Sequence, residues 1–296
     1  MNLGDIGTAM VTPFNEQGEI DEGLTKALVN HLVDHGTDTI VVNGTTGESP
    51  TVTREEKRQM LAWVLEEAAG RVKVIAGTGT NNTYESIELT KEAEEVGVDG
   101  VMLVTPYYNK PNQEALYAHF SAIAKETTLP ILLYNIPGRS VINMTAETTI
   151  RLAKDFANIQ GVKEASGDLE QMAAIIHGTD ESFAVYSGDD GLTLPLLAIG
   201  GTGIISVSSH VVGLEMKQMI QAYKNGDVAR ASKMHLALLP LFQALFKEPN
   251  PVPLKYALNQ QGIEVGDVRL PLVELQDKKS FDEAWKTWER EKKTIF

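Results

Sequence analysis

Short apolar runs rich in β-branched residues recur eight times along the chain, and more polar stretches separate them. Each run is too short for a buried helix, and Gly, Pro, Asn, Ser or Thr closes it or follows close behind. The pattern therefore predicts eight β-strands. They lie at residues 6–10, 39–43, 72–77, 100–105, 131–135, 159–165, 183–188 and 203–207.

Helical periodicity fills the intervals between these runs. At 22–35 and again at 55–69, apolar residues recur every three or four positions along one face. Thr53 followed by Glu56 has the spacing of a capping box, which marks the start of the second helix. Because parallel strands need crossover helices, the alternation of strands and helices predicts a parallel sheet.

Eight strand–helix units within residues 1–226 predict an α/β fold of the closed (β/α)8 type, a TIM barrel. An open, doubly wound sheet is the alternative, since periodicity does not report closure. After the eighth strand only helical patterns remain. We therefore expect a catalytic barrel at 1–226 and a C-terminal helical appendage at 227–296.

Composition narrows the classes of function. The 296 residues carry 26 basic and 40 acidic side chains, a formal net charge of −14, so we expect no nucleic-acid partner. The absence of cysteine excludes disulfides, zinc–thiolate sites, iron–sulfur clusters and thiol nucleophiles. Glycines and a proline interrupt the uncharged stretch at 191–214, and the opening residues are acidic rather than signal-like. We therefore expect a cytoplasmic protein without a membrane segment.

The sixth predicted strand ends with an unusual residue for a buried run, Lys163. In a barrel, chemistry lies at the C-terminal ends of the strands. Alternation places Lys163 opposite Val162, so Lys163 points into the barrel if Val162 faces the helices. Burial lowers the pKa of a lysine, and the free amine can form a Schiff base with a carbonyl. The alternative is a lysine that reaches solvent or pairs with Glu164.

Three further groups lie at predicted strand ends. Tyr134, in the fifth strand, is suited to proton relay, although a core tyrosine is the alternative. Arg139 follows the next turn, and its guanidinium is suited to binding a carboxylate. Thr45 and Thr46 lie in a Gly-bounded loop that offers donors to a small anion, or that is an ordinary turn. Together with Lys163, these residues suit a Schiff-base reaction on a 2-oxo acid.

Patterns for metals and dissociable cofactors are weak. Asp189 and Asp190 precede a predicted helix, so we expect them to cap it rather than to bind a metal. The segment at 77–79 lacks the third glycine of a dinucleotide fingerprint, and no GxSxG motif is present. We expect no metal and no cofactor beyond a covalent imine on Lys163.

Five motifs resemble those of the pyruvate-dependent class I aldolase superfamily that N-acetylneuraminate lyase typifies, and most closely its dihydrodipicolinate synthase family. The resemblance covers nearly the whole chain. The motifs are GTTGES at 44–49, TPYYNKP at 105–111, YNIPGR at 134–139, GVKEASGD at 161–168 and SGDD at 187–190.

The resemblance implies catalytic roles for four residues. Lys163 matches the lysine that forms an imine with pyruvate, and Tyr134 matches the tyrosine that shuttles protons. Thr45 matches a threonine that links this tyrosine to another one, which is Tyr108 here. In the family that second tyrosine reaches in from a neighbouring subunit, so we expect a homodimer or a homotetramer.

The resemblance also implies the substrate contacts. Thr46, with Thr45, matches the loop that holds the carboxylate of pyruvate, and Arg139 matches the arginine that receives the carboxylate of aspartate semialdehyde. Gly188 and Ile205 match positions that line the pocket. The implied reaction condenses pyruvate with L-aspartate 4-semialdehyde to give 4-hydroxy-tetrahydrodipicolinate, for diaminopimelate and lysine synthesis.

Two other functions stay open at this stage. One is another pyruvate-dependent aldolase, cleaving N-acetylneuraminate or a 2-keto-3-deoxy sugar acid. The other is a catalytically silent barrel that binds a 2-oxo acid. Members of the family that lysine inhibits carry two histidines where this chain has Arg54 and Lys57. Since cationic side chains repel the lysine ammonium, we expect no feedback inhibition by lysine.

Overall fold

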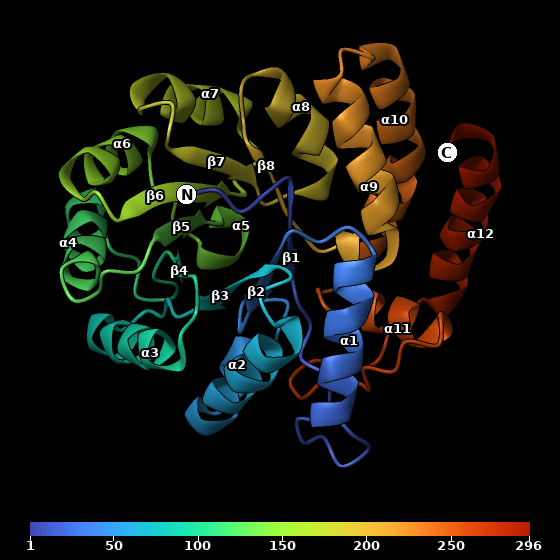
Figure 1. Cartoon of the computed structure of the whole chain (residues 1–296), viewed down its shortest axis with the longest axis horizontal. Coiled ribbons are helices and arrows are strands. Elements are labelled where there is room, and N and C mark those ends of the chain that lie inside the picture. The colour runs from blue at the N-terminus through green and yellow to red at the C-terminus, as the bar shows by residue number, and fades with distance from the viewer.

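The computed structural model describes all 296 residues, and it contains a closed barrel of eight parallel strands in sequence order (Figure 1). The strands are β1 (Ile6–Ala9), β2 (Thr39–Val42), β3 (Lys73–Gly77), β4 (Gly100–Val104), β5 (Ile131–Asn135), β6 (Ile159–Glu164), β7 (Ala184–Ser187) and β8 (Gly203–Ser206). Strand β1 pairs with β8, with Gly7 opposite Ile205, and this pairing closes the sheet. The (β/α)8 prediction is therefore confirmed, and the open sheet is wrong.

Helices surround the strands, and their ends follow local sequence signals. They are α1 (Glu22–Asp34), α2 (Arg54–Ala68), α3 (Thr83–Val96), α4 (Gln113–Ala124), α5 (Pro137–Ser140), α6 (Ala146–Asp155), α7 (Leu169–Gly178), α8 (Thr193–Ala198), α9 (Ser209–Lys224), α10 (Val228–Leu245), α11 (Val252–Gln260) and α12 (Lys278–Ile295). Two short 3-10 helices, η1 (Ser49–Thr51) and η2 (Asp190–Leu192), follow β2 and β7. The capping box is confirmed: Thr53 accepts from the amide of Glu56, and Glu56 accepts from that of Thr53.

Side chains on the strands alternate between two separate cores. A small core inside the barrel includes Leu132, Tyr134 and Tyr186. A larger core between the strands and the helices includes Leu133 and Val162. Because Val162 faces the helices, the alternation of the strand turns Lys163 toward the inside of the barrel.

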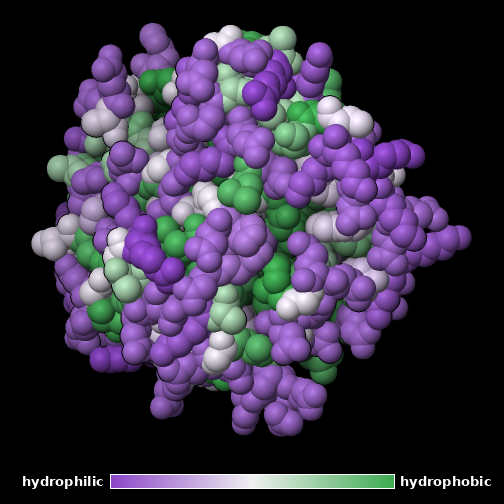
Figure 2. Space-filling model, turned by 45° about the vertical axis from the view of Figure 1, so that its right-hand side comes forward, coloured by the Kyte–Doolittle hydropathy of each residue, from purple (hydrophilic) through white to green (hydrophobic).

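The C-terminal helices lie against one side of the barrel. Helix α10 runs beside α9, and α12 lies along the outer side of α10, at the right of Figure 1. Helix α11 follows a segment that returns toward the barrel. The division at 226/227 stays a prediction, because α9 and α10 pack on one another across it. Figure 2 shows a mainly hydrophilic face with apolar side chains visible in the hollows, and none of the helices is long and apolar enough to cross a membrane.

Candidate active site

Lys163 and Tyr134 lie side by side inside the C-terminal part of the barrel. Register places Lys163 of β6 opposite Tyr134 of β5 on one side and Tyr186 of β7 on the other. The Lys163 Nζ atom lies 4.2 Å from the centroid of the Tyr134 ring. Only 4% of the surface of Lys163 is exposed, so the solvent-reaching alternative is wrong.

Burial shifts the pKa values of both groups in the direction that carbonyl chemistry needs. The pKa of Lys163 falls to about 8, chiefly because of burial; the carboxylate of Asp190 opposes this shift, and the guanidinium of Arg139 adds to it. Burial raises the pKa of Tyr134 to about 12, although Arg139 and a hydrogen bond with Thr45 counteract it. At pH 7 about one tenth of Lys163 is therefore free amine, and Tyr134 is a neutral phenol that can donate a proton.

A cavity of about 530 Å³ opens over Lys163 and gathers most of the expected site. Its lining includes Thr45, Thr46, Tyr134, Arg139, Lys163 and Gly188. Ile205 is fully buried in β8 and is not among the lining residues. Tyr108 lies outside the cavity, and 90% of its surface is exposed.

Gly188 leaves room for the lysine side chain. A Cβ atom at this position would lie 3.0 Å from Cε of Lys163 and 2.7 Å from Cβ of Ala165. Such contacts are closer than packed carbon atoms allow. Any larger residue at Gly188 would therefore displace the amine from its position beside Tyr134.

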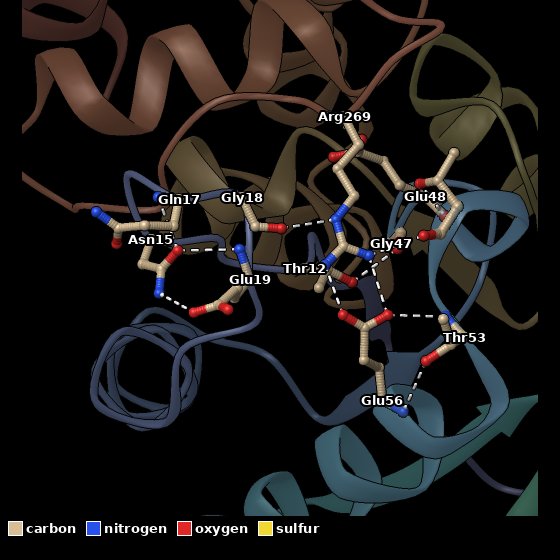
Figure 3. Close-up of polar contacts among 11 residues, drawn as sticks. Thr12, Asn15, Gln17, Gly18, Glu19, Gly47, Glu48, Thr53, Glu56 and Arg269 are labelled. Carbon is tan, nitrogen blue, oxygen red and sulfur yellow. Dashed lines mark hydrogen bonds and ion pairs between the residues drawn. The ribbon is translucent and has the colours of Figure 1, made fainter.

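A network of ion pairs fixes the loop that carries Thr45 and Thr46. Glu48, in the same loop, adopts a left-handed backbone conformation with φ of 55° and is buried. Its carboxylate lies 2.9 Å from Nζ of Lys255 and accepts a hydrogen bond from the amide of Arg269 at 2.9 Å. The guanidinium of Arg269 also pairs with Glu56 at the start of α2 (Figure 3). The C-terminal segment therefore holds the loop against the barrel.

Asn250 joins the same segment to both candidate carboxylate-binding groups. Its side-chain amide donates a 2.9 Å hydrogen bond to Oγ1 of Thr46, and its main-chain carbonyl accepts a 3.5 Å hydrogen bond from Arg139. The sequence analysis missed Asn250, Lys255 and Arg269. No local signal identifies them, because their partners are distant in the sequence.

The prediction that both Asp189 and Asp190 cap the following helix is wrong for Asp190. Asp189 caps η2 as expected, accepting from the amide of Gly191. Asp190 is instead buried, and it accepts hydrogen bonds from Oγ of Ser206, from the amide of Ser208 and from Oγ of Ser208. Its carboxylate ties the end of β8 to η2 close to Lys163. No group of three or more His, Cys, Asp or Glu residues is arranged to hold a metal ion.

A second cavity, of about 580 Å³, adjoins the first and shares Thr45, Tyr134 and Arg139 with it. It extends outward to Tyr107, Arg54 and Lys57. Burial lowers the pKa of Lys57, and Glu85 counteracts this effect. Two basic side chains therefore line the outer part of this cavity together with the carboxylate of Glu85, and Arg54 is also paired with Glu92 at 2.7 Å.

Comparison with known proteins agrees with this geometry. The sequence profile of the dihydrodipicolinate synthetase family matches residues 2–285. The chain belongs to this family. It is 57% identical over 277 residues to the 4-hydroxy-tetrahydrodipicolinate synthase of Bacillus subtilis, covering 94% of this chain and 96% of that protein. It is 59% identical over 275 residues to 4-hydroxy-tetrahydrodipicolinate synthase 1 of Halalkalibacterium halodurans, covering 93% of each chain.

Solved structures of the family superpose closely. The crystal structure of dihydrodipicolinate synthase from Bacillus anthracis has a TM-score of 0.94 and 52% identity, covering 98% of each chain. A structure from Cyanidioschyzon merolae, described with lysine bound, has a TM-score of 0.95 and 47% identity, covering 97% of this chain and 98% of that one. The prediction of a 4-hydroxy-tetrahydrodipicolinate synthase, a lyase of lysine biosynthesis, is therefore confirmed over the sugar acid aldolases.

Proposed function

We propose that the chain condenses pyruvate with L-aspartate 4-semialdehyde through an imine on Lys163. The observation that carries this assignment is a buried amine of lowered pKa beside a neutral phenol, in a cavity that the Thr46 hydroxyl and the Arg139 guanidinium also line. The amine attacks C2 of pyruvate, and the departing oxygen leaves as water after taking up protons. Tyr134 is placed to deliver a proton in this step.

The remaining steps follow from the electron-withdrawing character of the imine. Loss of a proton from the methyl carbon gives an enamine, whose carbon attacks the aldehyde of the second substrate. The amine of that substrate then attacks C2 and displaces Lys163, so the heterocycle forms as the enzyme amine is released. The protein holds the reactants and the proton carriers in position.

Two groups divide the recognition of the substrates. The Thr46 hydroxyl, with Thr45, holds the carboxylate of pyruvate close to Lys163. Arg139 lies at the junction of the two cavities and receives the carboxylate of aspartate semialdehyde, for which its guanidinium is suited. Gly188 supports the amine by leaving room for it, and Ile205 belongs to the inner core of the barrel that also contains Tyr134.

Trapping with a reductant tests the imine. Incubation with pyruvate and borohydride should attach one reduced pyruvate to Lys163, as located by peptide mass spectrometry. The Lys163→Met variant is the matched control and should remain unmodified. A wild-type chain that is not modified would refute the proposal and support the silent barrel. Turnover of aspartate semialdehyde, compared with N-acetylneuraminate and 2-keto-3-deoxy sugar acids, tests the second substrate.

Tyr108 completes the site from a second copy of the chain in this proposal, so the active form is a homodimer or a homotetramer. Its side chain is almost fully exposed, and its backbone has a φ of 72°, in the left-handed region. Tyr108→Phe and Lys163→Met chains, each inactive alone, should regain activity when refolded together, because one mixed site has both residues. No recovery would place Tyr108 outside the catalytic relay.

Two further assignments rest on the sequence and the family resemblance. We infer that the reaction needs no cofactor other than the covalent imine, and dialysis against a strong chelator should leave its rate unchanged. A cytoplasmic location stays a prediction. Both substrates are small carboxylates, and no nucleic acid enters the proposed reaction.

A further inference from the structure

Asn250 links the C-terminal appendage to the candidate substrate-binding loop. It lines the cavity over Lys163, and its own exposure is only 6%. Its amide nitrogen lies 2.9 Å from Oγ1 of Thr46, which is also buried, at 3% exposure. The two residues are 204 positions apart in the sequence, so tertiary folding alone brings them together.

The direction of this hydrogen bond decides what Thr46 can do. A hydroxyl has one proton and two acceptor positions. The amide of Asn250 occupies one acceptor position and is the hydroxyl's sole protein partner. The Thr46 proton is therefore free to be donated into the cavity, where an anionic carboxylate can accept it.

We propose that Asn250 is a positioning residue that holds the Thr46 hydroxyl as a donor toward the carboxylate of pyruvate. This inference rests on the proposed function, since pyruvate is the ligand. The hydroxyl would otherwise rotate or donate to another acceptor. Asn250 acts through Thr46 and does not take part in bond formation. The main-chain carbonyl oxygen of Asn250 accepts a separate hydrogen bond from Arg139, and substitution of the side chain leaves that oxygen in place.

Two anchors keep Asn250 against the loop. Five residues further along the chain, Lys255 forms its buried ion pair with Glu48 of the same loop. Arg269 donates through its main-chain amide to Glu48 and through its guanidinium to Glu56 (Figure 3). The contact between Asn250 and Thr46 therefore joins two segments that other bonds already fix. The Oδ1 atom of Asn250 is buried without a hydrogen-bond partner, so the side chain contacts the loop through its amide nitrogen only.

Reversal of the hydrogen bond is the sharpest test. In Asn250→Asp, the new carboxylate can only accept, so it takes the Thr46 proton and also repels the carboxylate of pyruvate. The pyruvate concentration that gives half-saturation in the borohydride trapping assay should rise about tenfold in Asn250→Ala, and by about a further tenfold in Asn250→Asp. With cyanoborohydride as the reductant, lowering the pH should weaken pyruvate trapping less in Asn250→Asp than in the wild-type chain. The loss of free Lys163 amine is common to both chains, whereas protonation of the new carboxyl removes its charge in the variant alone.

A double-mutant cycle separates positioning from general support of the fold. Asn250→Ala should weaken pyruvate binding about tenfold when Thr46 is present, and less than about twofold in a Thr46→Val background. The half-saturating concentration of aspartate semialdehyde should change by less than about twofold in each single variant. An undiminished effect of Asn250→Ala in the Thr46→Val background would overturn the proposal.

Asn259 provides a matched control in the same segment. Its side chain donates to the carbonyl of Gly266 and accepts from the amide of Val265, and it does not line the cavity. Asn259→Ala should lower the melting temperature and leave half-saturation by pyruvate unchanged. Equal pyruvate binding by the wild-type chain and Asn250→Asp would refute the positioning role of Asn250 and leave the proposed function intact. Failure of the wild-type chain to trap pyruvate would refute the proposed function.

Discussion

The lowered pKa of Lys163 makes a quantitative prediction about the pH dependence of imine formation. With a pKa of about 8, about one tenth of the lysine is free amine at pH 7. With the ordinary lysine pKa, about one part in three thousand would be free. The fold therefore raises the concentration of the nucleophile about 300-fold at pH 7. The rate of imine formation should rise about tenfold per pH unit below pH 8 and then level off.

The assay is the initial rate of pyruvate attachment at low pyruvate concentration. Cyanoborohydride serves as the trapping reagent because it survives mildly acidic solutions, and mass spectrometry measures the modified fraction. The Lys163→Met variant gives the background at each pH. An inflection close to pH 10.5, the ordinary value for lysine, would show that burial does not act on the amine as the geometry implies.

Substitutions at the two charged neighbours should move this inflection in opposite directions. The carboxylate of Asp190 raises the pKa of Lys163, so Asp190→Asn should shift the inflection to lower pH. The guanidinium of Arg139 lowers that pKa, so Arg139→Met should shift it to higher pH. Shifts of the same sign in both variants would contradict an electrostatic origin and point to altered packing.

Three other predictions follow from the same contacts. Lys163→Met should raise the free energy of unfolding at pH 7 by up to about 3 kcal/mol in urea denaturation, because below pH 8 the buried ammonium destabilises the folded state. This gain should shrink as the pH rises from about 8 to 10.5, where the lysine becomes neutral in both states. A gain that persists at pH 10.5 would assign the effect to packing. Tyr134→Phe should slow pyruvate trapping by about 10²- to 10⁴-fold and change the melting temperature little, and a smaller loss would remove Tyr134 from proton transfer. Millimolar lysine should leave initial rates unchanged, because Arg54 and Lys57 place cationic groups in the outer cavity; clear inhibition would show that other contacts in this cavity outweigh the repulsion.

Asp190 shows how burial can change the meaning of a sequence signal. Two aspartates before a short helix predict caps, and the first of them is a cap. The second lies against the end of β8, where two serines surround its carboxylate. The difference between the two depends on a packing contact with another strand, and the pattern around η2 holds no information about that strand.

Local regularity in the sequence determined the strands, the capping box and the placement of Lys163 on the face opposite Val162. Each depends on neighbours within a few positions: the period of a strand, the spacing of a cap and the alternation of side chains. The roles of Lys163, Tyr134, Thr45, Thr46 and Arg139 came from the motifs and the family resemblance.

Tertiary structure alone decided the closure of the barrel, the pKa of Lys163 and the partners of Thr46 and Glu48. Closure requires β1 to pair with β8, and the pKa depends on how much water and charge surround the amine. Asn250 and Lys255 reach the substrate-binding loop from the other end of the chain. Such contacts depend on the register and packing of segments that are distant in sequence, and periodicity along the chain does not encode these quantities locally.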